Sequence, residues 1–198
     1  MFRTLSIAAL ALAASTTVAS ADVLLDFASV TFDGGRATVT ATGGATVDTT
    51  SGIPVATTPL AAVLPNSSSV VTSLKLGGGL NFSEGMNYID LANIVIDTSN
   101  NLFVADVNLN GVATAGVTLF TFNQSLFGQT ISSLIGRQFS FAFTSTGAAD
   151  FNAGLGLTGG NVAKPGKLGG LLEVVPEPAA FGILGLGLAL VAAGRRRA

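Results

Sequence analysis

The alternation of apolar and polar positions along the middle of the chain predicts β-strands. In residues 102–109, Phe103, Ala105 and Val107 fall on one face of a strand, and Asp106 falls on the other. A period of two residues is typical of a strand with one buried face. The same alternation recurs further along, where small or polar residues separate three phenylalanines, Phe139, Phe141 and Phe143. We therefore expect these runs to bury one face in a common core.

Turn residues separate the strand-like runs and favour antiparallel pairing. Asn110-Gly111 follows one run directly, and both residue types tolerate the positive φ of a two-residue hairpin. Residues 97–101 (DTSNN) predict a second turn, and residues 146–155 predict one or two helical turns. The predicted fold class is mostly β, an antiparallel sandwich or a highly twisted sheet with at most one short helix.

Prolines and glycines suggest where the domain ends. Three prolines in residues 51–69 predict short edge pieces and loop there. Residues 152–170 hold seven glycines, which argues against a regular helix. We expect a β-rich extracellular domain over 22–160 and a flexible linker over 161–175.

Charge and composition narrow the classes of partner. Only 10% of the residues are charged, and the mean hydropathy is +0.63. Between positions 22 and 175 there are ten acids and five bases, with no basic stripe. Because nucleic-acid binding relies on clustered Lys and Arg, we expect no nucleic-acid partner.

The N-terminus has the three parts of a secretory signal peptide. Arg3 gives a positive start, residues 5–14 form an apolar run too short to span a bilayer, and Ala19 and Ala21 are small residues that signal peptidase accepts. We predict a signal helix and a signal peptide over 1–21. The alternative is an amphipathic first helix, although the run has no polar face.

The C-terminus carries a triplet, an uncharged run and an arginine cluster. The prolines of the triplet prevent a helix from extending backwards. The uncharged run predicts a transmembrane helix of about 24 Å. This is shorter than the hydrocarbon core of a bilayer, so either the flanking arginines snorkel or the bilayer thins. Arginines after the run place the tail in the cytoplasm and the domain outside. In chain order the parts are Pro176, Glu177 and Pro178; residues 179–194; and Arg195, Arg196 and Arg197.

These three parts together, over residues 176–198, resemble the PEP-CTERM sorting signal. The resemblance implies recognition by exosortase, a precursor transiently anchored in the inner membrane, and removal of the helix. It also implies release or attachment at the cell surface, with exopolysaccharide as a further partner. A plain tail anchor with an accidental triplet is the alternative.

Two stretches of the middle resemble the β domain of HtaA-type haem-uptake proteins. Residues 102–107 (LFVADV) carry the likeness to a strand that ends in L-x-A-D-V in that family. Residues 146–151 (TGAADF) carry the likeness to a late segment that reads T-x-x-G-A-x-x-F. The likeness implies the fold of that family, which binds haem through His and Tyr. This chain has no His, and its one Tyr is Tyr88. We therefore carry over the fold and not the haem site.

Patterns for catalysis and metal binding are weak. The chain has neither His nor Cys, which excludes a Ser-His-Asp triad and imidazole or thiolate ligands. Asp90, Asp97 and Asp106 are candidates for a carboxylate pair, although turns and solvated strand faces account for them. Residues 97–101 lack the spacing of a calcium loop. Residues 154–159 match G-x-G-x-x-G without a helix to follow, so a dinucleotide site is not expected.

The favoured function is an exported, non-catalytic surface or extracellular-matrix protein without cofactor or metal. Two alternatives stay open. One is a surface module that binds a haem-like or other apolar ligand, and the other is a secreted hydrolase that uses carboxylates.

Overall fold

The computed structural model describes residues 21–26, 37–50, 54–64, 70–158 and 162–176. They form eleven strands and two helices, α1 (Ile131–Leu134) and α2 (Ser145–Leu155). The strands are β1 (Ala21–Asp26), β2 (Thr38–Thr42), β3 (Thr46–Asp48), β4 (Val55–Leu64), β5 (Ser73–Leu76), β6 (Gly79–Glu84), β7 (Asn87–Asp97), β8 (Leu102–Leu109), β9 (Val112–Phe122), β10 (Gln138–Phe143) and β11 (Leu168–Pro176).

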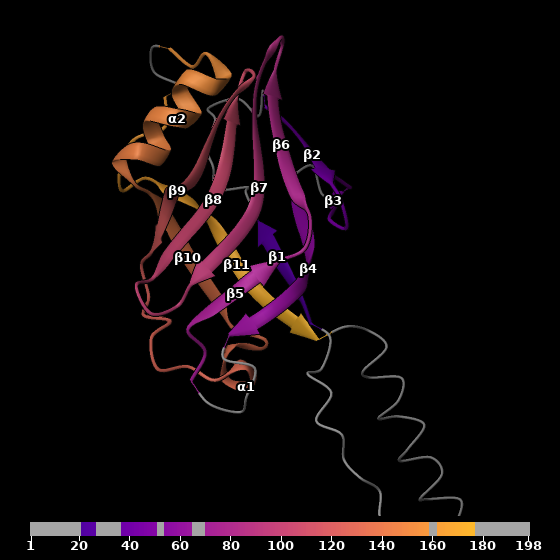
Figure 1. The fold of residues 1–198 in the computed structure, drawn as a ribbon, viewed down its shortest axis with the longest axis vertical. Helices are drawn as coiled ribbons and strands as arrows, with labels where there is room; N and C mark the ends of the chain where they lie inside the picture. Colours follow the sequence, from indigo (N-terminus) through magenta and orange to yellow (C-terminus); the bar gives the residue numbers. More distant parts are fainter. Residues whose placement is uncertain (1–20, 27–36, 51–53, 65–69, 159–161, 177–198) are drawn as a thin grey trace, which may run out of the picture.

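Eight antiparallel strands close into a barrel. Their order is β7-β5-β4-β1-β11-β10-β9-β8, and β8 pairs again with β7. Strands β6 and β2 continue the sheet from the first half of β7, and β3 pairs with β4. Figure 1 shows α2 beside the upper end of the strands and α1 at the lower end. The expectation of a mostly β, antiparallel fold is confirmed, and the sheet closes on itself. The expectation of at most one short helix is wrong, because both α1 and α2 form.

The prediction of a flexible linker before the C-terminal segment is wrong, because a barrel strand lies there. We expected a flexible linker over 161–175, but β11 occupies Leu168–Pro176 and pairs with β1 on one side and β10 on the other. Leu172 and Val174 point into the core. The segment therefore forms part of the barrel wall. The signal helix expected before Ala21 and the transmembrane helix expected over 179–194 lie outside the described residues. Among the residues described, no helix has the length and apolar character needed to cross a membrane.

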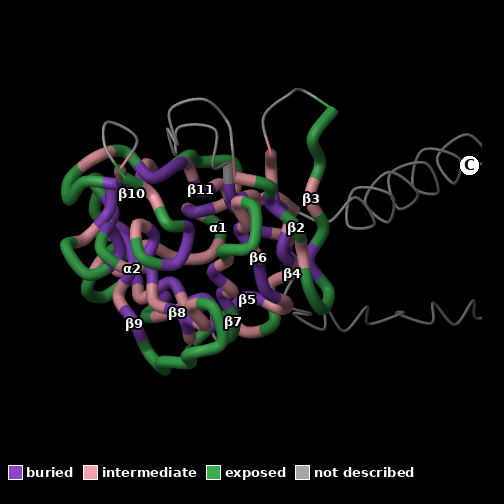
Figure 2. The backbone as a smooth tube through the Cα atoms, turned by 90° about the horizontal axis from the view of Figure 1, so that it is seen from above, coloured by how far each residue is buried: buried purple, intermediate pink, exposed green. Residues whose placement is uncertain are grey.

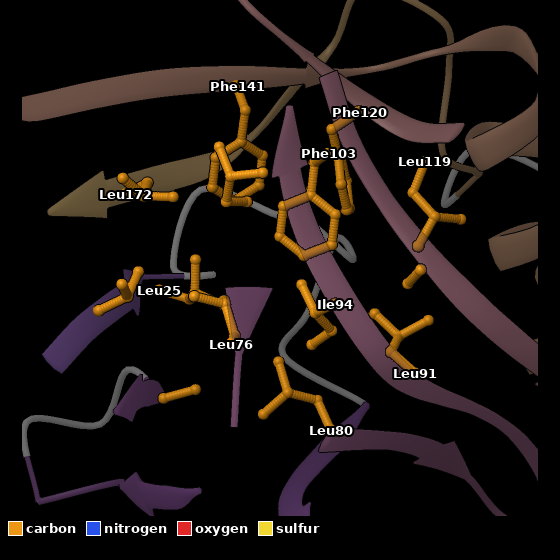
Figure 3. Close-up of a cluster of buried hydrophobic side chains, with 14 of the residues drawn as sticks. Leu25, Leu76, Leu80, Leu91, Ile94, Phe103, Leu119, Phe120, Phe141 and Leu172 are labelled. Carbon is orange, nitrogen blue, oxygen red and sulfur yellow. The ribbon is translucent and has the colours of Figure 1, made fainter. Parts of the chain in front are cut away.

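The core inside the barrel is centred on a cluster of phenylalanine rings. Phe120 lies at its centre, with its ring centroid 5.2 Å from that of Phe103 and 4.8 Å from that of Phe141. Figure 3 shows these three rings together, with Leu25 of β1 and Leu172 of β11 beside them. Figure 2 shows the buried segments gathered inside the barrel and the exposed ones at its rim. Tilted and edge-on ring pairs of this kind add to the stabilisation that burial gives.

The first turn of helix α2 packs against strand β9 of the barrel. Thr144 caps the helix: its side chain accepts a hydrogen bond from the Gly147 N–H at 2.9 Å and donates one to the Thr118 carbonyl at 2.7 Å. A Cβ added to Gly147 would lie 1.9 Å from the Leu119 carbonyl oxygen, so only glycine allows this approach. Phe151 then reaches the core and packs against Phe143. The stretch from Thr144 to Phe151 thus fits T-x-x-G-A-x-x-F, and each of its fixed positions serves the packing of α2.

Candidate functional site

The two ends of the described domain meet in one ladder. Ala21, the first residue of β1, is the cross-strand partner of Pro176, the last residue of β11. Val23 and Val174 pair two residues further in, and both are buried. Because proline has no N–H to donate, Pro176 suits the last position of a paired strand. We call the end of the barrel that carries Ala21 and Pro176 the terminal end.

Most of the predicted processing residues lie beyond this ladder. Ala19, Glu177, Pro178, Arg195, Arg196 and Arg197 lie outside the described residues. Of the predicted signal-cleavage and sorting positions, the structure places Ala21 and Pro176, and it brings them side by side. No local pattern in the sequence indicated this pairing, since the two residues lie at opposite ends of the domain.

Tyr88 lies at the opposite end of the barrel, half-buried near the start of β7. Its backbone N–H donates to the Asn110 side-chain oxygen at 2.7 Å, and the Asn110 N–H donates to the Tyr88 carbonyl at 3.2 Å. Asn110 also donates from its side chain to the Gly154 carbonyl of α2 at 3.1 Å. This network joins β7, the β8–β9 turn and α2, so the Tyr88 backbone is held firmly.

A groove of about 400 Å³ runs over the outer face of β7, β8 and β9. Asp90 and Asp106 line it together with small residues such as Ala92 and Ala113. Asp90 accepts a hydrogen bond from the Asn81 side chain at 2.6 Å. Asp106 accepts one from the Asn93 side chain at 2.7 Å and one from the Gly116 N–H at 2.8 Å.

The hydrogen bonds to Asp106 lower the pKa of its carboxyl group, which does not suit a general acid. The bond from Asn93, and then that from Gly116, favour the charged form and hold the pKa of Asp106 below its ordinary value of 3.8. A general acid of a glycosidase instead needs a raised pKa. The Asp106 side chain is therefore suited to remain a charged carboxylate and not to donate a proton.

Asp97 does not join the other two carboxylates. It lies at the far end of β7, where its Oδ1 accepts the N–H groups of Ser99 and Asn100, both at 3.0 Å. It lies seven positions after Asp90 along the strand, which is roughly 20 Å at the usual rise. A glycosidase pair needs about 5 to 10 Å, so Asp90 and Asp97 cannot act as one. Within the described ranges, no three of His, Cys, Asp and Glu gather where they could hold a metal ion.

The G-x-G-x-x-G match falls at the wrong end of a helix for phosphate binding. Gly154 lies in the last turn of α2, and Gly156 is its C-cap with φ of 65° in the left-handed region. Phosphates bind where backbone N–H groups are free, at a helix N-terminus. Gly156 instead ends the helix, as glycine commonly does.

The fold is similar to that of solved structures of HtaB and HtaA from Corynebacterium glutamicum. The structure matches heme binding protein HtaB with a TM-score of 0.54 and 11% identity, covering 80% of this chain and 94% of that one. It matches the N-terminal domain of HtaA with a TM-score of 0.54 and 14% identity, over 79% and 96% of the two chains. The C-terminal domain of HtaA matches with a TM-score of 0.51 and 15% identity, over 78% and 94%. At these identities the likeness shows a shared fold, as the two stretches in the sequence indicated.

The C-terminal part of the chain matches a known sorting motif. Residues 174–197 match the PEP-CTERM protein-sorting motif. The match begins inside β11, at Val174, and runs on through the apolar segment and the arginines. Such a motif implies export, recognition by exosortase and a membrane-anchored precursor that is processed. No curated protein matches the chain.

Proposed function

We propose that this chain is a non-catalytic surface or extracellular-matrix protein, exported through its signal peptide and sorted by exosortase. The observation that carries the proposal is the PEP-CTERM match at 174–197. The partners are then signal peptidase, exosortase, the inner membrane as a transient anchor, and exopolysaccharide at the final location.

The pairing of Ala21 with Pro176 supports this proposal. Both processing segments continue from the terminal end of the barrel, so one face of the folded domain is presented to the membrane during processing.

The test is the intact mass of the protein in envelope and medium fractions of a host that carries exosortase. The wild type is compared with a variant in which Pro176, Glu177 and Pro178 are all changed to Ala. We expect a wild-type product that begins near Asp22 and lacks 179–198, and a variant that keeps its tail in the inner membrane. Tails retained in both proteins would instead indicate a plain membrane anchor.

A second candidate function is the binding of a haem-like ligand, favoured by the similarity to HtaB and HtaA. Besides His and Cys, which the chain lacks, Met and Tyr are side chains that ligate haem iron in proteins. Within the described ranges these are Met86 and Tyr88, two residues apart where β6 turns into β7. Met86 is almost fully exposed, so its thioether is accessible.

A titration of the secreted protein with haem tests this candidate. A Soret shift that Tyr88→Phe abolishes would support a site at the start of β7, and Met86→Leu then tests the second position. Phe127→Leu, an exposed change at the terminal end, is the control and should leave the titration unchanged. An absent shift, or one that survives both Tyr88→Phe and Met86→Leu, removes this candidate.

A further inference from the structure

The terminal end of the barrel exposes large apolar side chains. Leu64 at the end of β4 is 54% exposed, Val70 before β5 is 42% exposed, and Phe127 in the β9–β10 connection is 66% exposed. Single exposed apolar residues are ordinary, but three on one end mark a surface to explain.

Backbone hydrogen bonds bring the three side chains to the same end. The Thr72 N–H donates to the Leu64 carbonyl at 2.6 Å, and the Val71 N–H donates to the Gln129 carbonyl at 2.8 Å. These bonds join the two flanks of the β4–β5 connection to the segment that carries Phe127. The resulting group of Leu64, Val70 and Phe127 is called the apolar rim below.

The apolar rim lies at the end where β11 finishes. After α1, Ile135 forms a bridge with Val174, and the Gly136 N–H donates to the Val174 carbonyl at 2.8 Å. Strand β4 pairs with β1 through Pro59 opposite Asp22, and then continues past that point to Leu64. Figure 1 shows α1 and the arrowheads of β4 and β11 toward the lower end, away from α2.

Phe127 is held in its exposed position. The preceding Leu126 is buried, and its N–H donates to the Asn101 side-chain oxygen at 2.6 Å. The Phe127 N–H donates to the Ser125 hydroxyl at 3.3 Å. The first bond ties the backbone of this loop to the β7–β8 turn, so the Phe127 ring is held at the terminal end of the barrel.

The sequence after β11 leaves little distance between this rim and the apolar segment. Two residues, Glu177 and Pro178, separate Pro176 from the uncharged run that starts at Ala179. A fully extended chain spans at most about 3.5 Å per residue, so the gap is roughly 10 Å. If the run lies in a membrane, the terminal end of the barrel must rest at the membrane surface.

We propose that the apolar rim inserts into the interfacial layer of the membrane while the sorting segment is still attached. The lipid surface is the partner, and Leu64, Val70 and Phe127 are the contacts. The proposal rests on the proposed function, since it requires a membrane anchor after β11. The tether raises the effective concentration of the surface, so even a few side chains suffice for stable contact.

Both positive and negative side chains lie at the terminal end, so the contact with the membrane rests mainly on insertion of apolar side chains. Arg137 is exposed there and stacks over Phe139 at 5.3 Å, where its guanidinium can reach lipid phosphates. Asp22, Asp97 and Glu173 lie near the same end. The contact is therefore expected to persist at high salt, unlike one that depends on anionic lipid.

The absence of cysteine allows a test with one label per molecule. The full chain, with its C-terminal segment, is purified from membranes of a host without exosortase. It is reconstituted into vesicles of phosphatidylethanolamine and phosphatidylglycerol. An environment-sensitive fluorophore is attached after Phe127→Cys, or after Val112→Cys as the matched control. Val112 is 68% exposed, at the opposite end of the barrel.

We expect the label at position 127 to shift to shorter emission wavelength and to be quenched several-fold more strongly by spin-labelled lipid than the label at 112. Equal quenching at both positions, in protein that floats with the vesicles, overturns this proposal and leaves the anchor intact. Protein that does not float with vesicles overturns the anchor as well. Leu64→Cys supplies a second position on the rim, and urea unfolding of each labelled variant verifies its fold.

Discussion

Ala21 and Pro176 stand opposite each other at one end of the β1–β11 ladder. The first and the last strands of the domain are therefore neighbours in the barrel wall, and each also has a second partner, β4 for β1 and β10 for β11. A truncation that reaches into β1 or β11 therefore removes part of the barrel wall itself.

A chain that stops before β11 should fail to fold. Ending the protein at Lys167 leaves β1 and β10 with unpaired edges, and it removes Leu172 and Val174 from the core. Unpaired edges favour aggregation. We expect this variant, made without the signal segment, to be insoluble or to lack a cooperative urea transition. The control ends at Pro178 and should unfold cooperatively; equal behaviour of the two would mean that β11 is dispensable.

Gly147→Ala should destabilise the protein strongly. The new methyl would meet the Leu119 carbonyl oxygen, so α2 would have to move away from β9 and take Phe151 with it. We expect a loss of about 3 kcal/mol, measured by urea unfolding. Thr146→Ala, at an exposed position next to it, is the control and should change stability by less than about 0.5 kcal/mol.

Truncation to alanine should lower the stability of the protein at Phe120 but not at Phe127. Phe120 is fully buried among several other rings, so Phe120→Ala should cost about 3 to 5 kcal/mol. Phe127 is largely exposed, so Phe127→Ala should be close to neutral. Denaturant unfolding of the two variants decides this. A large loss for Phe127→Ala would show that this ring packs within the protein and would count against its role at a membrane.

Asp106 should contribute to the pH dependence of stability. Its carboxylate accepts hydrogen bonds from Asn93 and Gly116, so its folded pKa lies below the ordinary 3.8. A carboxylate with a lowered pKa stabilises the fold above the ordinary pKa, and this contribution is lost as pH falls through the folded pKa. Between about pH 6 and pH 2.5, Asp106→Asn should therefore lose less stability than the wild type.

The measurement is the urea midpoint across this pH range. Asn93→Ala removes the larger cause of the lowered pKa, so it should show a weaker pH dependence than the wild type. Identical pH profiles for all three proteins would show that Asp106 binds protons equally in the folded and unfolded states. Because this carboxyl is solvent-exposed, the differences should be small.

Local pattern was sufficient to predict the strands with regular alternation and the turns between them. The hairpin at Asn110-Gly111 forms with φ of 50° and 95°, as the residue types indicated. Strand β11 was missed because its glycines resembled a linker. A Cβ on Gly169 would come within 2.7 Å of the Phe120 ring, so this glycine makes room for a neighbour on another strand. That reason is tertiary and cannot be read locally.

Strand β4 was missed for a similar reason. Its Pro59 predicted loop or an edge piece, yet the strand runs through that residue within the barrel wall. Pro59 falls where β4 changes partner, from β1 before it to β5 after it, and the register with β5 is irregular just beyond. A missing N–H does little harm at such a point. For the candidate site, the sequence indicated the sorting residues but not that Pro176 pairs with the start of β1.

The closure of the barrel by β1 and β11 has a consequence for the order of events during export. The pairing of β1 with β11 joins the two ends of the domain, so it cannot form until the whole intervening chain is available. For a chain threaded through a translocation channel from its N-terminus, the barrel stays open until β11 emerges on the far side. The apolar run begins three residues after the end of β11. If this run anchors the precursor in the membrane, as proposed, completion of the fold and arrest in the membrane coincide. The barrel can therefore close only when translocation of the domain is complete.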